Sequence, residues 1–257
     1  MRQSDMAAPA AAHAIAVLQL LARRAEPLPA AAIARALDLP RSSTYRVLTV
    51  LKETGFVVHL DEDRRWGLGV AAFELGSAYS RQAPLQRIAR PILTRLVDAT
   101  THNAHLAVLH GRDVLYVIEE RAPRRPSLVT DVGVRLPATV TASGLAMLAA
   151  LPSAQVRALY PDRDSFAQRN GLGPTSLTQL RSALATVRQR GIATESDSVT
   201  AGFASVAAAV LDHNDFPVAG IALTYPVDQV SDPEKAAIDV RRSAAELSRR
   251  LGRRAQT

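Results

Sequence analysis

A chain of 257 residues, 47% of them hydrophobic, is long enough for two domains that each bury a core. The absence of cysteine excludes disulfides, thiolate catalysis and cysteine-ligated metal sites. The net charge of +7 favours an anionic partner such as nucleic acid. However, six arginines crowd the end of the chain, where they also fit the solvated face of a terminal helix: Arg241, Arg242, Arg249, Arg250, Arg253 and Arg254. Charge alone therefore does not identify DNA as the partner.

Neither a secretory signal nor a membrane span is expected. Residues 1–12 are rich in alanine but lack a basic flank followed by a long apolar run. No apolar stretch reaches the roughly 18 residues that a membrane helix needs. We therefore expect a cytoplasmic protein.

Three short helices are predicted at the start of the chain. Apolar side chains recur at helical spacing over residues 13–25. Pro29 is placed to open a second helix, and residues 41–44 begin a third, with a serine as its N-cap. Asp38, Leu39 and Pro40 form a tight break between the last two helices. This order is typical of a helix-turn-helix.

A hairpin is predicted directly after the third helix, with strands at 56–60 and 65–68, which is the position of a wing. A recognition helix presents its N-terminal residues to base edges in the major groove. Arginine can bind guanine with two hydrogen bonds, and hydroxyl groups can bind phosphates or bases. The candidate DNA contacts on the third helix and the wing are Arg41, Ser42, Ser43, Thr44, Tyr45, Arg46, Arg64 and Arg65.

Helices and strands are mixed in the larger second part. The predicted helices cover 85–100, 141–150, 176–190 and 232–251, and the predicted strands cover 105–109, 114–118, 206–211 and 218–224. A helix over 70–81, with a hinge at 82–84, would join this part to the first. The expected organisation is a DNA-binding domain over 1–69, a linker helix over 70–84 and a second domain over 85–257.

Short motifs distributed over residues 12–252 resemble the IclR-type transcription regulators. The matching residues in the first part are Ile33-Ala34, Leu37, Leu39, Ser43-Thr44, Arg46, Leu48, Leu51, Gly55, Leu68-Gly69 and Leu75-Gly76. Those in the second part are Gly133, Leu136-Pro137, Ala142-Ser143-Gly144, Arg190-Gly191-Ile192 and Gly202. The resemblance implies an α+β multidomain fold, in which a winged helix-turn-helix precedes a GAF-like α/β domain with a central antiparallel sheet.

The resemblance also implies a one-component regulator that binds operator DNA and responds to a small organic or aromatic acid. It would form homodimers through its N-terminal helices, or tetramers, on a palindromic operator. The positions implied for the effector are Leu128, Ala142, Ser143, Glu195, Ser205, Ala222 and Thr224. Thr139, Leu145 and the pair Ala204-Ser205 stand where the family has His, Lys and Arg-Cys. These departures make the pocket less cationic. An aromatic or more hydrophobic effector is therefore as compatible with the sequence as a small acid.

Metal binding and catalysis are not expected, and one alternative function remains. His102 and His105 have the spacing of helical metal ligands, with His110 nearby, but they lie at the entry to a predicted strand without a carboxylate, so neither metal nor cofactor is expected. No nucleophile and base are spaced for catalysis, so an enzyme is not expected. The alternative is a helix-turn-helix protein whose second domain only oligomerises, which a closed, side-chain-filled cavity beside the last two strands would favour.

Overall fold

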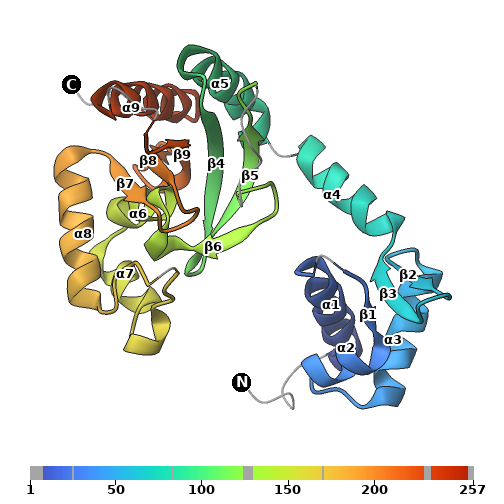
Figure 1. Cartoon of the computed structure of the whole chain (residues 1–257). Coiled ribbons are helices and arrows are strands. Elements are labelled where there is room, and N and C mark those ends of the chain that lie inside the picture. Colours follow the sequence, from blue (N-terminus) through green and yellow to red (C-terminus); the bar gives the residue numbers. More distant parts are fainter. Residues whose placement is uncertain are drawn as a thin grey trace. The chain divides into compact units, whose positions relative to one another are not determined.

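The chain folds into two compact units, residues 1–83 and residues 84–257 (Figure 1). The computed structural model describes residues 8–24, 26–82, 84–123, 130–169, 171–228 and 233–253. Residues 70–82, predicted to belong to a separate linker helix, form a helix that falls within the first unit. Across the described ranges, no helix has both the length and the apolar character needed to cross a membrane.

The first unit is a winged helix-turn-helix, as predicted. Its elements are α1 (Pro9–Ala22), β1 (Leu28–Pro29), α2 (Ala30–Ala36), α3 (Arg41–Glu53), β2 (Val57–Leu60), β3 (Arg65–Leu68) and α4 (Val70–Gln82). The strands form a small antiparallel sheet in the order β1-β3-β2. β2 and β3 are the arms of the wing.

The core of this unit fixes α3 against α1 and α2. Val17, Ile33 and Leu48 are completely buried in one cluster, which Trp66 of β3 closes from the wing. Asp38 adopts a left-handed backbone conformation with φ of 52°, which allows the sharp turn between α2 and α3. The predicted serine N-cap of α3 is wrong, because Pro40 holds that position and no side chain caps the helix.

The second unit is an α/β domain with one six-stranded sheet, which confirms the predicted fold class. Its strands are β4 (Asn103–His110), β5 (Asp113–Glu120), β6 (Arg135–Pro137), β7 (Ala193–Ser196), β8 (Phe203–Leu211) and β9 (Pro217–Pro226). They pair in the order β6-β5-β4-β9-β8-β7, and every pair is antiparallel. Its helices are α5 (Pro84–Thr100), α6 (Ala142–Ala150), α7 (Ser153–Leu159), α8 (Leu177–Arg190) and α9 (Pro233–Arg250), with short 3-10 turns η2 (Ala138–Val140) and η3 (Arg163–Ser165).

The two faces of this sheet are covered by different helices. Leu106 and Ile221 point into a core shared with α5 and α9. Side chains alternate along a strand, so Ala107 and Ala222 point the other way, toward clusters that contain residues of α6. The second face, under α6, carries the cavity described below.

Two glycines let the start of α6 approach its neighbours closely. A Cβ atom on Gly144 would lie 2.1 Å from the carbonyl oxygen of Ala138. A Cβ atom on Gly220 of β9 would lie 3.2 Å from the Cβ of Ser143. Thr141 caps the helix, since its Oγ1 accepts a hydrogen bond from the Gly144 N–H at 3.1 Å. The first turn of α6 is therefore pressed onto β9.

Candidate functional site

The polar face of α3 is open to solvent in the first unit. Arg41, Ser42, Tyr45 and Arg46 are exposed, and Tyr45 retains 55% of its accessible surface although it is a large aromatic residue. Ser43 is half-buried. The buried positions Leu48 and Leu51 lie on the opposite side of the helix. This arrangement leaves hydrogen-bond donors free to enter a groove of DNA.

Thr44 does not belong to this face, which corrects the sequence-based assignment. Its exposed fraction is 0%, and its Oγ1 donates to the carbonyl oxygen of Pro40 at 3.1 Å. A threonine hydroxyl that bonds back to the preceding turn is satisfied within the helix, so its side chain can be buried. Thr44 therefore positions the start of α3 and is not available to a duplex.

The two arginines of the wing differ in their surroundings. Arg64 is exposed at the tip, where its φ of 51° turns the chain from β2 into β3. Arg65 is half-buried, and its Nη1 donates to the carbonyl oxygen of Pro27 at 3.3 Å and lies 3.7 Å from Glu26. Arg64 is thus the freer of the two, while Arg65 also ties the wing to the segment before α2.

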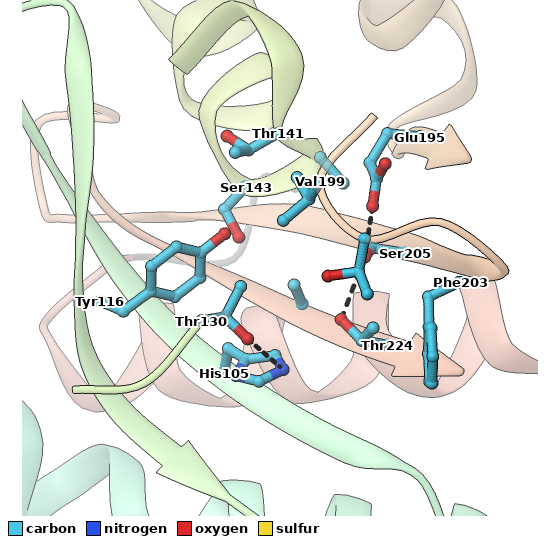
Figure 2. A pocket seen from close by; sticks show the side chains of 13 residues that line it. His105, Tyr116, Thr130, Thr141, Ser143, Glu195, Val199, Phe203, Ser205 and Thr224 are labelled. Carbon is cyan, nitrogen blue, oxygen red and sulfur yellow. Dashed lines mark hydrogen bonds between the residues drawn. The ribbon is translucent and has the colours of Figure 1, made fainter. Parts of the chain in front are cut away.

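The second unit contains a cavity beneath the start of α6, between β4, β5, β8 and β9 (Figure 2). Six of the seven residues named for the effector line it: Ala142, Ser143, Glu195, Ser205, Ala222 and Thr224. Leu128 lies outside the described residues. Residues far apart in the sequence are thus brought together by the order of strands in the sheet.

Seven further lining residues were missed by sequence reasoning. They are His105, Tyr116, Thr130, Thr141, Val199, Thr200 and Phe203. The alternation along β4 and β5 places His105 and Tyr116 on the same face as the cavity, with ring centroids 5.7 Å apart. The strand pattern could have marked them as candidates, but not the pairing of β4 with β9 that brings them to this place.

A hydrogen-bonded chain of three side chains forms one wall of the cavity. Ser205 Oγ donates to Glu195 Oε1 at 2.7 Å and lies 3.0 Å from Thr224 Oγ1 (Figure 2). Because the Ser205 proton goes to Glu195, Thr224 is the donor of the second bond. Glu195 Oε2 also accepts the Ser198 N–H at 3.3 Å. This wall therefore carries a carboxylate whose direction is fixed.

Polar atoms without partners form the other wall. Ser143 is 1% exposed, and its Oγ has no hydrogen-bond partner among the described residues. Nδ1 of the fully buried His105 likewise has none, although its Nε2 lies 3.4 Å from Thr130 Oγ1. The hydroxyl groups of Ser143 and Tyr116 point into the same space in Figure 2. Each unpaired buried polar atom costs about 1–3 kcal/mol, so this wall suits a ligand that supplies the partners.

The electrostatics of the cavity are those of a neutral to acidic site. Burial lowers the pKa of His105 from 6.5 to about 4, with Arg121 acting in the same direction, so its ring is neutral at pH 7. Burial raises the pKa of Glu195, and burial likewise raises the pKa of Tyr116. No lysine or arginine occurs among the described lining residues. A bound anion would rely on hydrogen bonds and on the start of α6 for its stabilisation.

Replacement of His105 by Gln should flatten the acid side of the stability profile. The folded pKa of about 4 lies below the ordinary 6.5, so between these values the unfolded chain binds a proton that the folded chain does not. The cost to the wild type begins as the pH falls below 6.5 and reaches about 2 kcal/mol near pH 5. Urea unfolding of both proteins near pH 7.5 and pH 5 measures it. If the free energy of unfolding fell by the same amount between these pH values in both proteins, the lowered pKa of His105 would be contradicted. The wild type alone would not isolate this effect, because the raised pKa of Glu195 stabilises the folded state as the pH falls. The variant keeps Glu195, so the difference between the two proteins reports on His105.

The free space in the cavity is small. The described side chains leave about 10 Å³, roughly the room of one water molecule. Any larger ligand requires the walls to move. No group of three or more histidine and acidic side chains in the described ranges is placed to hold a metal ion.

Comparison with known proteins identifies both units. Residues 10–61 match the model of the IclR helix-turn-helix domain, and residues 77–249 match the model of the bacterial transcriptional regulator IclR C-terminal domain. The chain is 32% identical over 245 residues to the glycerol operon regulatory protein of Streptomyces coelicolor, covering 93% of this chain and 95% of that one. It is 28% identical over 202 residues to the transcriptional repressor IclR of Escherichia coli, covering 78% and 73% of the two chains.

A solved structure confirms the fold. An IclR homologue from Microbacterium hydrocarbonoxydans, crystallised with 4-hydroxybenzoate, superposes with a TM-score of 0.78 at 24% identity, and the match covers 94% of this chain and 98% of that one.

Proposed function

The chain belongs to the IclR family of bacterial transcription regulators, and we propose that it reads operator DNA with α3 and releases or rearranges on that DNA when a small molecule enters the cavity under α6. The family is one of DNA-binding regulators with an effector domain, not of enzymes. The observation that carries the proposal is the exposed polar face of α3, whose opposite, apolar face is buried. It would act in the cytoplasm, where the operator is.

DNA recognition is proposed to use Arg41, Ser42, Tyr45 and Arg46, supported by Ser43 and by Arg64 of the wing. The four residues of α3 share the exposed side of one helix, and a helix of this width fits the major groove. Arg64 at the wing tip can reach phosphates or the minor groove. Arg65 has a supporting role, because its guanidinium already bonds to Pro27.

Arg46→Ala should weaken operator binding by about 1–3 kcal/mol if the side chain contacts a base. Fluorescence anisotropy with a labelled operator duplex measures the loss. Arg157→Ala, at an exposed position of α7 in the other unit, removes the same charge and is the matched control. Equal affinity of the Arg46 variant and the wild type would reject a contact by Arg46.

Effector binding is proposed in the cavity. A ligand larger than the free 10 Å³ must push apart the walls, so it binds one arrangement of the unit better than the other. That difference in affinity is what a regulator needs in order to shift between states. The α4 helix, which joins the recognition domain to the sensor, is the proposed route of the coupling.

The polar groups that line the cavity favour a small hydroxylated organic or aromatic acid. Its carboxylate would lie at the N-terminus of α6, beside the unpartnered Ser143 Oγ. Its hydroxyl would donate to the wall of Glu195, Ser205 and Thr224, whose carboxylate is an acceptor. A hydroxyl at one end and an acid at the other also describes the ligand of the Microbacterium homologue.

Ser143→Ala combined with Thr224→Ala should weaken effector binding by at least about tenfold while leaving operator affinity intact. A panel of aromatic and small aliphatic acids, each with and without a hydroxyl, is screened by thermal shift. Saturating ligand stabilises the wild type by mass action, by about 2.7 kcal/mol at 100 times its Kd. Ser182→Ala, at an exposed position of α8, is the control. An undiminished shift in the double variant would reject the placement of the ligand.

Assembly into dimers is proposed through the N-terminal helices. Ile15 of α1 and Val70 and Phe73 of α4 are exposed by 56%, 67% and 75%, although all three are large apolar residues. Such residues on two helices of one unit suit burial against a second copy. Two recognition helices in a dimer would read a palindromic operator, and pairing of dimers into a tetramer is an extension of the same proposal.

A second function is favoured by one observation. The small free volume of the cavity is what a domain used only for oligomerisation would show. The unpartnered Ser143 Oγ and His105 Nδ1 favour the sensor instead, because buried polar atoms in a purely structural core are normally hydrogen-bonded. If none of the aromatic and aliphatic acids in the screen binds the second unit, oligomerisation becomes the better assignment.

A further inference from the structure

A second hollow of about 400 Å³ lies on the C-terminal unit, along the edge of β8. β7 pairs with β8 only from Ala204 to Ala207, so the edge from Ala208 to Leu211 has no strand partner in the described part of the chain. Residues of α6 and α8 form one side of this groove and residues of α9 form the other. We infer that the groove is a binding site for a small organic anion with an apolar body, separate from the cavity under α6.

The floor of the groove is made of small apolar side chains. Ala146 and Ala149 come from α6, Ala208 and Ala209 from β8, and Ala244 from α9. Methyl groups from three elements make a surface that an aromatic ring or an alkyl chain can cover. The volume lies in the range of about 300–1,000 Å³ that small-molecule sites occupy.

Two arginines at the rim are positioned by hydrogen bonds to the backbone and form no ion pair among the described residues. Arg188 Nε donates to the carbonyl oxygen of Ala149 at 2.7 Å, and Arg241 Nε donates to that of Ala237 at 3.4 Å. Neither guanidinium forms an ion pair with a carboxylate in the described ranges. Their terminal amino groups therefore remain available to bind carboxylate, sulfonate or phosphate.

The remaining charges of the groove agree with an anionic ligand. Arg253 is a third lining cation and is paired with Asp215, which lies outside the lining. The described lining residues include no aspartate or glutamate. The ligand is thus matched in charge to the rim and in polarity to the floor.

A small molecule fits this groove better than an added peptide strand. The open edge of β8 is short, and the Leu211 N–H at its end already donates to Ser248 Oγ at 2.9 Å. A peptide strand would find few free backbone groups there. The ligand would instead touch Ala146 and Ala149 of α6, the helix whose first turn carries Ser143, so one helix is shared by both sites.

Titration of the full chain with 8-anilinonaphthalene-1-sulfonate, a fluorescent aromatic anion, tests the inference. We expect saturable binding that weakens at least about tenfold in the double variant Arg188→Gln, Arg241→Gln. Ala245→Leu, which keeps both arginines and places a larger side chain in the groove from an exposed position of α9, should weaken binding to a similar extent. The uncharged analogue N-phenyl-1-naphthylamine should bind at least about tenfold more weakly than the anion.

Matched control variants distinguish binding in the groove from nonspecific binding of the anion to the protein surface. Arg181→Gln with Arg249→Gln removes one exposed arginine from each of α8 and α9 outside the groove, and Ser143→Ala alters the other site; both should bind the anion as the wild type does. Near-ultraviolet circular dichroism checks that each variant is folded. The inference is overturned if binding is unsaturable, if the folded groove variants bind the anion with wild-type affinity, or if they change the oligomeric state in sedimentation while anion binding stays the same.

Discussion

Gly144→Ala is expected to lower the free energy of unfolding of the C-terminal unit by about 3 kcal/mol or more. The added Cβ would lie 2.1 Å from the carbonyl oxygen of Ala138 and 2.4 Å from its Cα. Both are backbone atoms, so no side-chain rotation can relieve the clash. The first turn of α6 would have to move away from the η2 turn, and with it the cap formed by Thr141.

Gly76→Ala is the matched control for this substitution. Gly76 also lies in a helix, α4, but a Cβ added there meets nothing within 4 Å. Since alanine is the better helix former, this change should be neutral or stabilising by up to about 1 kcal/mol. Urea unfolding monitored by circular dichroism measures both variants. A C-terminal unit of unchanged stability in the Gly144 variant would show that α6 does not press on η2 as described.

Leu48→Ala is expected to lower the free energy of unfolding of the first unit by about 2–5 kcal/mol. Leu48 is completely buried and lies in one cluster with Val17, Ile33 and Trp66, so the shorter side chain leaves a cavity behind the recognition helix. A unit of this size buries a small core and therefore has a low free energy of unfolding. Operator binding should therefore be lost as well, while the C-terminal unit stays folded.

The control lies two positions further along the same helix. Val50 is 57% exposed, so Val50→Ala should change the stability by no more than about 0.5 kcal/mol. Differential scanning calorimetry follows the transition of the first unit, and effector binding reports on the second. If both variants unfolded at the wild-type temperature, Leu48 would not be the anchor of α3.

In the second unit, the long elements were predictable from the sequence, and the short ones were not. Helices 85–100, 141–150 and 176–190 repeat apolar residues over several turns, and each occurs within a few residues of its prediction. β6 and β7, with three and four residues, are too short to show a period. Helix α7, with seven residues, was missed for a similar reason. Such elements are defined by the partners they pack against.

The candidate sites were predictable to different degrees. The polar face of α3 follows directly from helical spacing, because one helix carries all its residues. Thr44 was misassigned because a threonine hydroxyl can bond back to its own helix and be buried. His105 and Tyr116 were missed because the cavity depends on the pairing of β4 with β9, which local sequence does not specify.

Selection of genomic DNA fragments by the full chain tests the central claim most directly. We expect the wild type to enrich a sequence with two-fold symmetry and the folded double variant Arg41→Ala, Arg46→Ala to enrich none. Enrichment of the same sequence by the double variant, or no enrichment by the wild type, would contradict the proposal that the exposed face of α3 reads an operator.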